Sequence, residues 1–179
     1  ASKTAERISN LGRFLEEYLG DCVSNQPAFD KAGCESSARA FQKSREGRLL
    51  LFELADASEQ LRFAEWDGAR KAFRLHLTPF FSERGLALSA GRPRGLDRRG
   101  LPIVKNVPVW VQSPGGERDF GFRRALERGM LRVELLVRAN RPWQFERSGD
   151  DPIRGVDASL VGLRVHSSRG NEVLAEQMY

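Results

Sequence analysis

The sequence predicts an α+β fold, in which an N-terminal amphipathic helix packs on an antiparallel β-sheet of short strands. Two observations support this prediction. The first 26 residues hold one long helical pattern, whereas short apolar runs separated by turn residues follow Pro27. The segments between these runs are short, as hairpins require, and are not the long crossovers that parallel strands need. The 179 residues therefore fit a single domain, with the helix at 1–26 and a β-rich head at 27–179.

The N-terminal helix is predicted over residues 4–22, where apolar side chains recur at spacings of three and four. We expect this apolar stripe to pack on the sheet. Replacement of Leu15 by alanine should be among the most damaging changes in the helix, because burial of a large apolar side chain contributes about 1.5–3 kcal/mol. The stripe consists of Ile8, Leu11, Leu15, Tyr18 and Leu19.

The two cysteines, Cys22 and Cys34, are separated by eleven residues. Turn-forming residues at 25–27 and Gly33 favour a fold-back of Cys34 towards the end of the helix. This favours a disulfide between the two cysteines, which would imply an oxidising compartment. Two free, buried thiols in a cytosolic protein are the alternative.

The strands are predicted from apolar alternation. A short helix at 36–44 and a helical turn at 120–128 interrupt them, and Asp67-Gly68 predicts a hairpin turn. Pro108 predicts an edge strand or a bulge, because proline has no N–H to donate to a neighbouring strand. Residues 140–155 are expected to be a loop. The predicted strands are 48–54, 61–66, 72–77, 85–90, 103–112, 131–137 and 160–166, with a short final run that ends at Tyr179.

The basic residues are concentrated in the middle of the chain, which has a formal net charge of +5. Residues 61–148 hold 18 basic and 9 acidic side chains. Four arginines lie in the loop 91–100, GRPRGLDRRG, and clustered arginine attracts phosphates. This loop holds no aromatic side chain on which bases stack. Nucleic acid is therefore not an expected partner, and the loop is expected to be solvated and mobile.

No catalytic signature is present. The sequence has no phosphate-binding loop, no nucleophile elbow and no dinucleotide fingerprint. His76 and His166 lie alone in strand-like runs, so neither a metal site nor a catalytic triad is predicted. The protein is expected to be non-enzymatic and to need no cofactor.

Two short motifs in the last third have a recognisable spacing. Arg124 and Arg128 form R-x-x-x-R, and Asp157, Ser159 and Gly162 form D-x-S-x-x-G. These motifs resemble those of the PilZ domain, which binds cyclic di-GMP. The resemblance implies that the arginines face phosphates and guanines and that the aspartate and serine hold guanine edges. A cytoplasmic receptor for cyclic di-GMP is the alternative prediction, because a PilZ barrel needs several more strands than the remaining 17 residues supply.

The order of helix, cysteine-containing turn and sheet resembles the ectodomains of type IV minor pilins and type II secretion pseudopilins, of the PilW-like and GspJ-like groups. The resemblance rests on RISNLGRFLEEYLGDC, the Gly33-Cys34 element, and the runs LLLFELADASEQLRFAEWDG and VKNVPVWVQSPGG. It implies a non-enzymatic subunit of a bacterial pilus or secretion filament, whose charged helix face, with Arg7, Arg13 and Glu17, contacts other pilin or pseudopilin subunits.

This resemblance also implies a location. Pilins and pseudopilins are periplasmic or at the cell surface, and a hydrophobic N-terminal helix anchors them in the inner membrane before assembly. The 179 residues do not contain such a helix. Contact with a membrane is therefore expected only through a segment that would precede Ala1.

Overall fold

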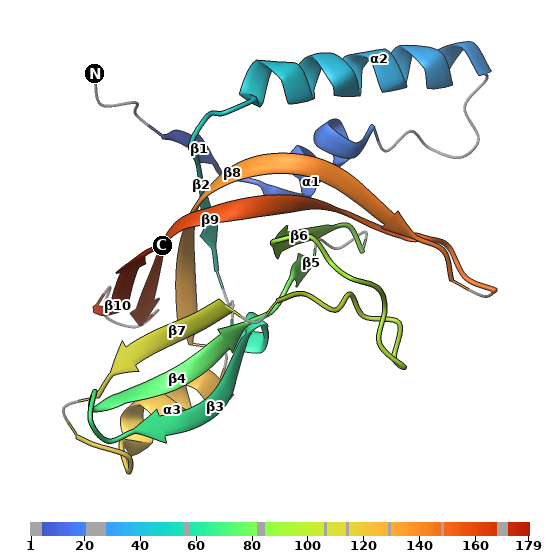
Figure 1. Cartoon of the computed structure of the whole chain (residues 1–179). Helices are drawn as coiled ribbons and strands as arrows, with labels where there is room; N and C mark the ends of the chain where they lie inside the picture. The colour runs from blue at the N-terminus through green and yellow to red at the C-terminus, as the bar shows by residue number, and fades with distance from the viewer. Residues whose placement is uncertain are drawn as a thin grey trace.

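In a computed structural model, the chain is mostly β-structure, arranged as a large and a small sheet with helices beside them (Figure 1). The structure describes residues 5–20, 28–55, 58–81, 85–105, 107–113, 115–128, 130–147, 149–167 and 172–179. Within these residues the helices are α1 (Leu11–Leu19), α2 (Ala28–Arg45) and α3 (Phe120–Glu127), with one 3₁₀ turn, η1 (Ser58–Gln60). None of these helices has the length and apolar character that crossing a bilayer requires.

The large sheet is built around the hairpin of β8 (Leu131–Phe145) and β9 (Ile153–Ser167). β2 (Leu50–Leu54) pairs antiparallel with β8, and β1 (Glu6–Ile8) pairs parallel with β2. Two strands share the other side of β9. β6 (Ala87–Ala90) pairs with its first half, and β10 (Val173–Met178) pairs with its second half. β5 (Phe80–Phe81) lies beside β6.

The small sheet has the order β3 (Leu61–Asp67), β4 (Ala72–Leu77) and β7 (Val107–Gln112), with antiparallel pairing throughout. One face of this sheet packs on α3, where the rings of Phe73 and Phe122 stack with 5.4 Å between their centroids. A single cluster of buried apolar residues continues from this interface through the large sheet to α1. The core therefore joins both sheets.

The helices α1 and α2 lie on one side of the curved β8–β9 pair, and the small sheet with α3 lies on the other (Figure 1). Phe14 of α1 connects the layers, because its ring centroid is 5.1 Å from that of Phe52 on β2 and 5.7 Å from that of Phe41 on α2. The side chain of Gln42 on α2 donates a hydrogen bond of 2.6 Å to the carbonyl of Tyr18. α1 is therefore enclosed between the sheet and α2.

The predicted α+β architecture, with one helix on a small antiparallel sheet, is wrong. The chain is mostly β, it forms two sheets, and the pairs β1–β2 and β6–β9 are parallel. Only residues 36–44 of α2 were predicted to be helical, whereas the helix spans 18 residues. These features depend on contacts between segments that are distant in sequence, and local periodicity does not contain that information.

The N-terminal helix is shorter than the predicted range 4–22. It begins at Leu11, because the side chain of Asn10 accepts the N–H of Arg13 at 2.8 Å and so caps the first turn. It ends where Gly20 adopts a left-handed conformation with φ of 59°. Ile8, predicted as part of the helical stripe, lies instead in strand β1.

The rest of the predicted stripe does pack inward. Leu15 and Tyr18 are buried, with exposures of 0 % and 3 %, whereas Leu11 and Leu19 are half-buried. Phe14 was not assigned to the stripe, yet it is also buried. The buried face of α1 is therefore formed by Phe14, Leu15 and Tyr18, and it is shifted towards Phe14 from the predicted stripe.

Of residues 140–155, predicted to be a loop, 140–145 belong to β8 and 153–155 to β9. Trp143 is buried, and its indole N–H donates to the hydroxyl of Ser89 at 3.2 Å. The N–H of Arg141 donates to the carboxylate of Asp157 at 2.7 Å. These bonds reach from β8 to two other strands, and they extend the hairpin through a stretch whose local composition is that of a loop.

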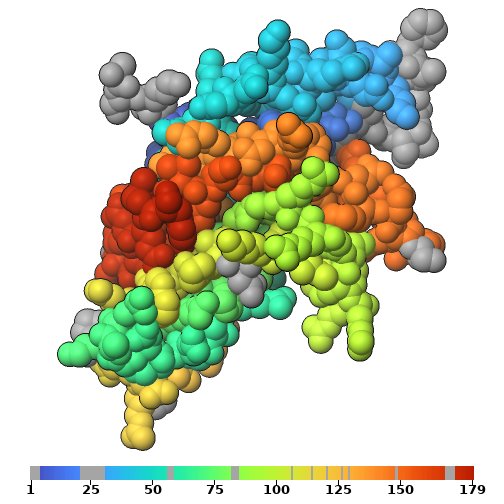
Figure 2. Space-filling view, in the orientation of Figure 1, coloured from blue at the N-terminus to red at the C-terminus, as the bar shows by residue number. Residues whose placement is uncertain are grey.

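Other elements are confirmed. The hairpin at 61–77 forms as β3 and β4, and the carboxylate of Asp67 accepts the N–H groups of Ala69 and Arg70 in its turn. β2 and the helical turn at 120–128 are present as well. The segment 91–105 lies outside the named strands and projects from the body of the protein (lime in Figure 2).

Candidate functional site

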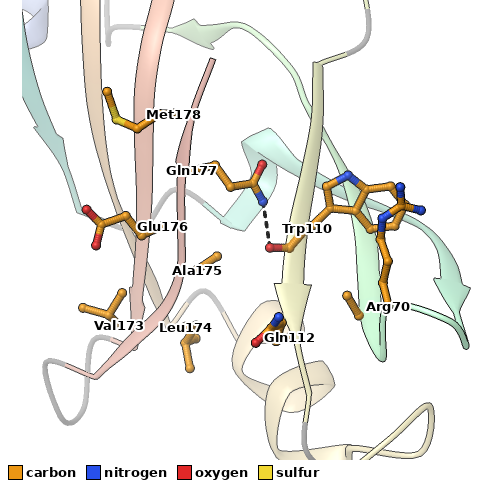
Figure 3. A pocket seen from close by; sticks show the side chains of 10 residues that line it. Arg70, Trp110, Gln112, Val173, Leu174, Ala175, Glu176, Gln177 and Met178 are labelled. Atoms are coloured by element: carbon orange, nitrogen blue, oxygen red, sulfur yellow. Dashed lines mark hydrogen bonds between the residues drawn. The ribbon is translucent and has the colours of Figure 1, made fainter.

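The candidate site is a groove between β10 of the large sheet and β7 of the small sheet (Figure 3). It has a volume of about 690 Å³. All of β10 lines one side, and β7 with the turn between β3 and β4 lines the other. The lining residues are Arg70, Ala72, Trp110, Gln112 and residues 173–178.

Two side chains of the C-terminal segment bridge the groove. The amide of Gln177 donates to the carbonyl of Trp110 at 2.8 Å, and the hydroxyl of Tyr179 donates to the carbonyl of Pro108 at 3.0 Å. From Gln177 to Tyr179 the chain moves forward by two residues, and the residues that they contact on β7, Trp110 and Pro108, move backward by two. The two strands therefore run antiparallel and in register, but side chains join them in place of a backbone ladder.

The groove-facing edge of β7 carries main-chain groups without a β-partner. β7 pairs with β4, and no other described strand pairs with it. The carbonyls of Pro108 and Trp110 face β10, and because backbone groups alternate along a strand, those of Gln112 face the same way. The N–H groups of Trp110 and Gln112 have no hydrogen-bond partner among the described residues. The edge strand predicted from Pro108 is confirmed, because β7 lies at the edge of the small sheet.

The facing edge of β10 is similar. The N–H of Tyr179 donates to the carbonyl of Val161 on β9 at 3.0 Å, which shows that Tyr179 directs its main-chain groups to β9. Alternation along β10 then directs every second residue towards the groove. In the regularly paired part of β10, the residues whose main-chain groups face the groove are Glu176 and Met178. Both walls therefore present main-chain donors and acceptors.

The β7 wall also carries a cation stacked on an indole. The guanidinium of Arg70 lies 4.6 Å from the ring centroid of Trp110, and it is held there by Asp67 at 2.6 Å (Figure 3). The N–H and the guanidinium of Arg70 lower the pKa of the Asp67 carboxyl below its ordinary value. Asp67 is therefore ionised at neutral pH and fixes the position of Arg70.

A charged cluster fixes β10 against the large sheet. Arg164 on β9 contacts Glu134 on β8 at 3.1 Å and Glu176 on β10 at 2.9 Å. His166 lies 3.0 Å from the same oxygen of Glu134. Burial raises the pKa of Glu134, but the hydrogen bonds and charges of His166 and Arg164 outweigh this effect and lower it. The pKa of Glu176 is lowered by its bond to Arg164. These contacts therefore fix β10, one wall of the groove, to β8 and β9.

The arrangement is suited to holding an extended chain. Main-chain groups on facing edges form hydrogen bonds with any backbone that enters in the β-conformation. Within the described residues there is no group of three or more His, Cys, Asp and Glu side chains placed to hold a metal ion. The groove lining contains no histidine, cysteine, serine or threonine, the side chains that most often act as nucleophile or base.

The two motifs that resemble the PilZ domain are not brought together. Arg124 and Arg128 are exposed on and just after α3, beside the small sheet. Asp157 lies in β9 of the large sheet, where it holds the N–H of Arg141, and Ser159 accepts the side-chain amide of Asn140 at 3.0 Å. In Figure 1 α3 lies beside the small sheet, away from the β9–β6 pair in the centre of the molecule.

Gly162, the last residue of the second motif, is buried and faces Met178. A Cβ at Gly162 would come within 2.8 Å of the Met178 sulfur, so the glycine allows β10 to approach β9 closely. Its role in this structure is therefore one of packing.

The remaining predicted residues do not line the groove. Leu15 and Tyr18 belong to the core. Cys34 lies on α2 and is disulfide-bonded. Its predicted partner, Cys22, lies outside the described residues, so the Cys22–Cys34 pair stays a prediction.

Sequence reasoning did not identify the groove residues. Pro108 predicted an edge, but no sequence signal pairs residues near 110 with residues near 177. A stronger hint lay in β10 itself, whose sequence VLAEQM contains neither lysine nor proline, the residues that commonly protect an edge strand.

Searches of curated proteins and of solved structures return no match to the chain. A family defined by its sequences matches residues 2–178, which is nearly the whole chain. The chain therefore belongs to DUF6066, a family of unknown function.

Proposed function

We propose that the protein is a non-enzymatic binding protein, and that the groove between β7 and β10 takes up an extended polypeptide segment by β-strand addition. The observation that carries this proposal is the pair of facing strand edges, which run antiparallel and in register at Gln177–Trp110 and Tyr179–Pro108. A segment that enters the groove would find main-chain partners on one wall.

The length of the groove sets the length of the segment. β10 contributes four residues, 173–176, before the Gln177 bridge, and a strand advances about 3.4 Å per residue, so the open wall extends over roughly 14 Å. A segment of about four residues in extended conformation matches this length. Its side chains would point alternately to the two faces of the joined sheets, and on one face they would meet the indole of Trp110.

The exposed edge of β10 also favours strand addition. Natural edge strands are commonly protected by lysine, proline or irregular pairing, because unprotected edges add further strands. β10 has no lysine or proline; its one irregularity is a register shift against β9 between Val173 and Ala175, and its pairing is regular from Ala175 to Met178. Val173 and Met178 are 49 % and 69 % exposed. On β7 the proline lies at the end that Tyr179 already bridges, so Trp110 and Gln112 keep their N–H groups.

The proposal changes the place of the expected subunit contact. Contact was expected along the charged face of the N-terminal helix, where Arg13 and Glu17 are exposed, and this stays a prediction. The groove offers main-chain pairing groups that the helices lack. Membership of a pilus or a secretion filament stays a prediction that no described residue tests.

The experiment is a selection of random linear peptides on the wild-type protein, followed by affinity measurements on two variants. Glu176→Pro removes the groove-facing N–H of β10 and leaves the hydrogen bonds of β10 to β9, because that N–H points away from β9. Glu176→Ala removes only the side chain.

We expect peptides that bind the wild type to lose about tenfold in affinity on Glu176→Pro, since one main-chain hydrogen bond and its neighbours are lost. On Glu176→Ala the affinity should change by less than about threefold. Equal losses on both variants would mean that binding depends on the Glu176 side chain, through direct recognition or through its bond to Arg164, and not on the main-chain N–H. Peptides that bind Glu176→Pro as well as the wild type would place their site elsewhere. Either result contradicts the proposal.

A further inference from the structure

Residues 91–100, which were expected to be a mobile loop, form an ordered hairpin together with residues 101–105, and the strand predicted over 103–112 begins only at Val107. Main-chain hydrogen bonds join the two arms of the hairpin: the N–H of Arg94 donates to the carbonyl of Ile103, and the N–H of Ile103 donates to the carbonyl of Gly95, both at 2.9 Å. Leu96 and Pro102 form an isolated β-bridge. The guanidinium of Arg147, just after β8, donates to the carbonyl of Gly100 at 2.8 Å. The arginines of the hairpin are therefore displayed on a fixed frame.

The only acidic residue of the hairpin is used to hold its turn. The carboxylate of Asp97 accepts the N–H of Leu101 at 2.9 Å and the N–H of Arg99 at 2.8 Å. These bonds lower the pKa of Asp97. The basic side chains of the hairpin are all exposed, and none forms an ion pair with a residue that the structure describes. They are Arg92, Arg94, Arg98, Arg99 and Lys105.

Apolar side chains are exposed between these cations. Leu101 and Ile103 are 36 % and 48 % exposed, and Phe81 of β5 is 37 % exposed beside them. All three line a hollow of about 210 Å³ under the hairpin. Large apolar side chains at the surface, surrounded by charged ones, mark interaction sites. In Figure 2 the hairpin projects away from the body.

We propose that the hairpin 91–105 docks the protein on the surface of an anionic phospholipid membrane. The cations would lie among the lipid phosphates, while Leu101 and Ile103 enter the boundary between headgroups and acyl chains. The neighbouring β8–β9 turn carries Asp150 and Asp151, which reduce the net positive charge of this end of the molecule. Charge alone is therefore a weak attraction here, and the apolar side chains must contribute.

The exposed aliphatic side chains favour a membrane over nucleic acid. Leucine and isoleucine gain nothing from a phosphate backbone and have no flat face on which a base stacks. In a lipid interface the same side chains leave water, and this adds to the electrostatic attraction. The hairpin lies on the opposite side of Figure 1 from β10, so docking would leave the groove open to a polypeptide partner. This proposal does not depend on the function of the groove.

The test is sedimentation of the full chain with two kinds of vesicle: phosphatidylcholine alone, and phosphatidylcholine with about one third phosphatidylserine. The wild type should bind the anionic vesicles only, and less so at high salt. Arg98→Gln with Arg99→Gln should lower the partition coefficient by up to about 25-fold, since each cation contributes about fivefold. Leu101→Ser with Ile103→Ser should remove the binding that remains at high salt.

The matched control is Arg39→Gln with Arg128→Gln, which removes the same charge at exposed positions on α2 and just after α3. It should bind like the wild type within about twofold, and all variants should show the thermal unfolding of the wild type. An equal loss in the control would show attraction by overall charge and would overturn the proposal. So would a lack of binding to anionic vesicles, or tighter binding to a single-stranded or duplex oligonucleotide than to vesicles.

Discussion

The side-chain amide of Gln177 reaches across from β10 and donates a hydrogen bond of 2.8 Å to the main-chain carbonyl of Trp110 on β7. This bond and that of Tyr179 hold the two sheets in antiparallel register while leaving their edges unpaired. Gln177 therefore closes one end of the groove and fixes its width.

Removal of this bridge should weaken the protein measurably. Gln177→Ala removes the half-buried bond to the Trp110 carbonyl and an acceptor of the exposed Tyr179 hydroxyl, and we expect the free energy of unfolding to fall by about 1 kcal/mol. Urea unfolding at neutral pH measures the change. The matched control is Gln144→Ala, whose exposed side chain bonds only to Glu146 and should change stability by less than about 0.5 kcal/mol. Equal effects of the two substitutions would show that Gln177 does not join the sheets.

Two glycine-to-alanine substitutions should change the stability of the protein in opposite directions. At Gly155 a Cβ would meet the Trp143 ring at 2.3 Å and the carbonyl of Ala87 at 2.4 Å, so Gly155→Ala should cost about 1–3 kcal/mol of stability. At Gly33, inside α2, a Cβ would meet nothing within 4 Å. Gly33→Ala should therefore stabilise the protein by about 0.5–1 kcal/mol, because alanine favours the helix.

Both glycine effects are measurable as shifts in the midpoint of thermal unfolding. A stable Gly155→Ala protein would mean that β8 and β9 separate near Trp143 at little cost. Gly33→Ala is the control for Gly155→Ala. If both substitutions lowered stability, the loss at Gly155 could not be assigned to a clash with Trp143 and Ala87.

The parts of the fold that the sequence predicted correctly are those decided by neighbours in the chain. The hairpin β3–β4 follows from alternation and from Asp67-Gly68, and Pro108 identified an edge strand. Residues 140–155 were assigned to a loop because their composition is that of a loop. They form strands because Trp143 packs on Gly155 and bonds to Ser89, and these contacts involve three different strands.

The candidate site could not be predicted for the same reason. Its two walls are 60 residues or more apart in the chain, and they face one another only because β9 is long enough to pair with both β6 and β10 on one side. The sequence shows an edge at β7 and an unprotected run at 173–178, but it does not show that these edges meet. The two motifs that resemble those of the PilZ domain illustrate the converse, because their spacing in sequence did not bring Arg124 and Asp157 together.

The core of α1 gives a third prediction. Leu15 is fully buried, so Leu15→Ala should destabilise the protein by about 2–5 kcal/mol through lost burial and the cavity left behind. Leu11 is half-buried and its replacement by alanine should cost clearly less. Urea unfolding of both variants makes the comparison. Equal costs at the two positions would contradict the orientation of α1 on the sheet.

The attachment of β10 should depend on pH. Glu134 and Glu176 both have pKa values lowered below the ordinary 4.5, through their contacts with His166 and Arg164. A carboxyl whose pKa is lower in the folded state stabilises that state above its ordinary pKa, and this contribution is lost as pH falls through the folded pKa. We therefore expect β10 to loosen when the pH falls below about 4.5.

Amide hydrogen exchange measures this loosening strand by strand. The amides of β10 that donate to β9, such as those of Gln177 and Tyr179, should lose protection on acidification before those of the β3–β4 hairpin, after correction for the intrinsic rates. In Glu176→Gln the bond to Arg164 is already weakened at neutral pH, so β10 should exchange faster there and respond less to acid. If β10 keeps its protection in acid as well as the β3–β4 hairpin does, the charged cluster does not hold the groove wall. The position of β10 would then depend on its main-chain pairing with β9 alone, and peptide affinity for the groove would be insensitive to substitution of Arg164.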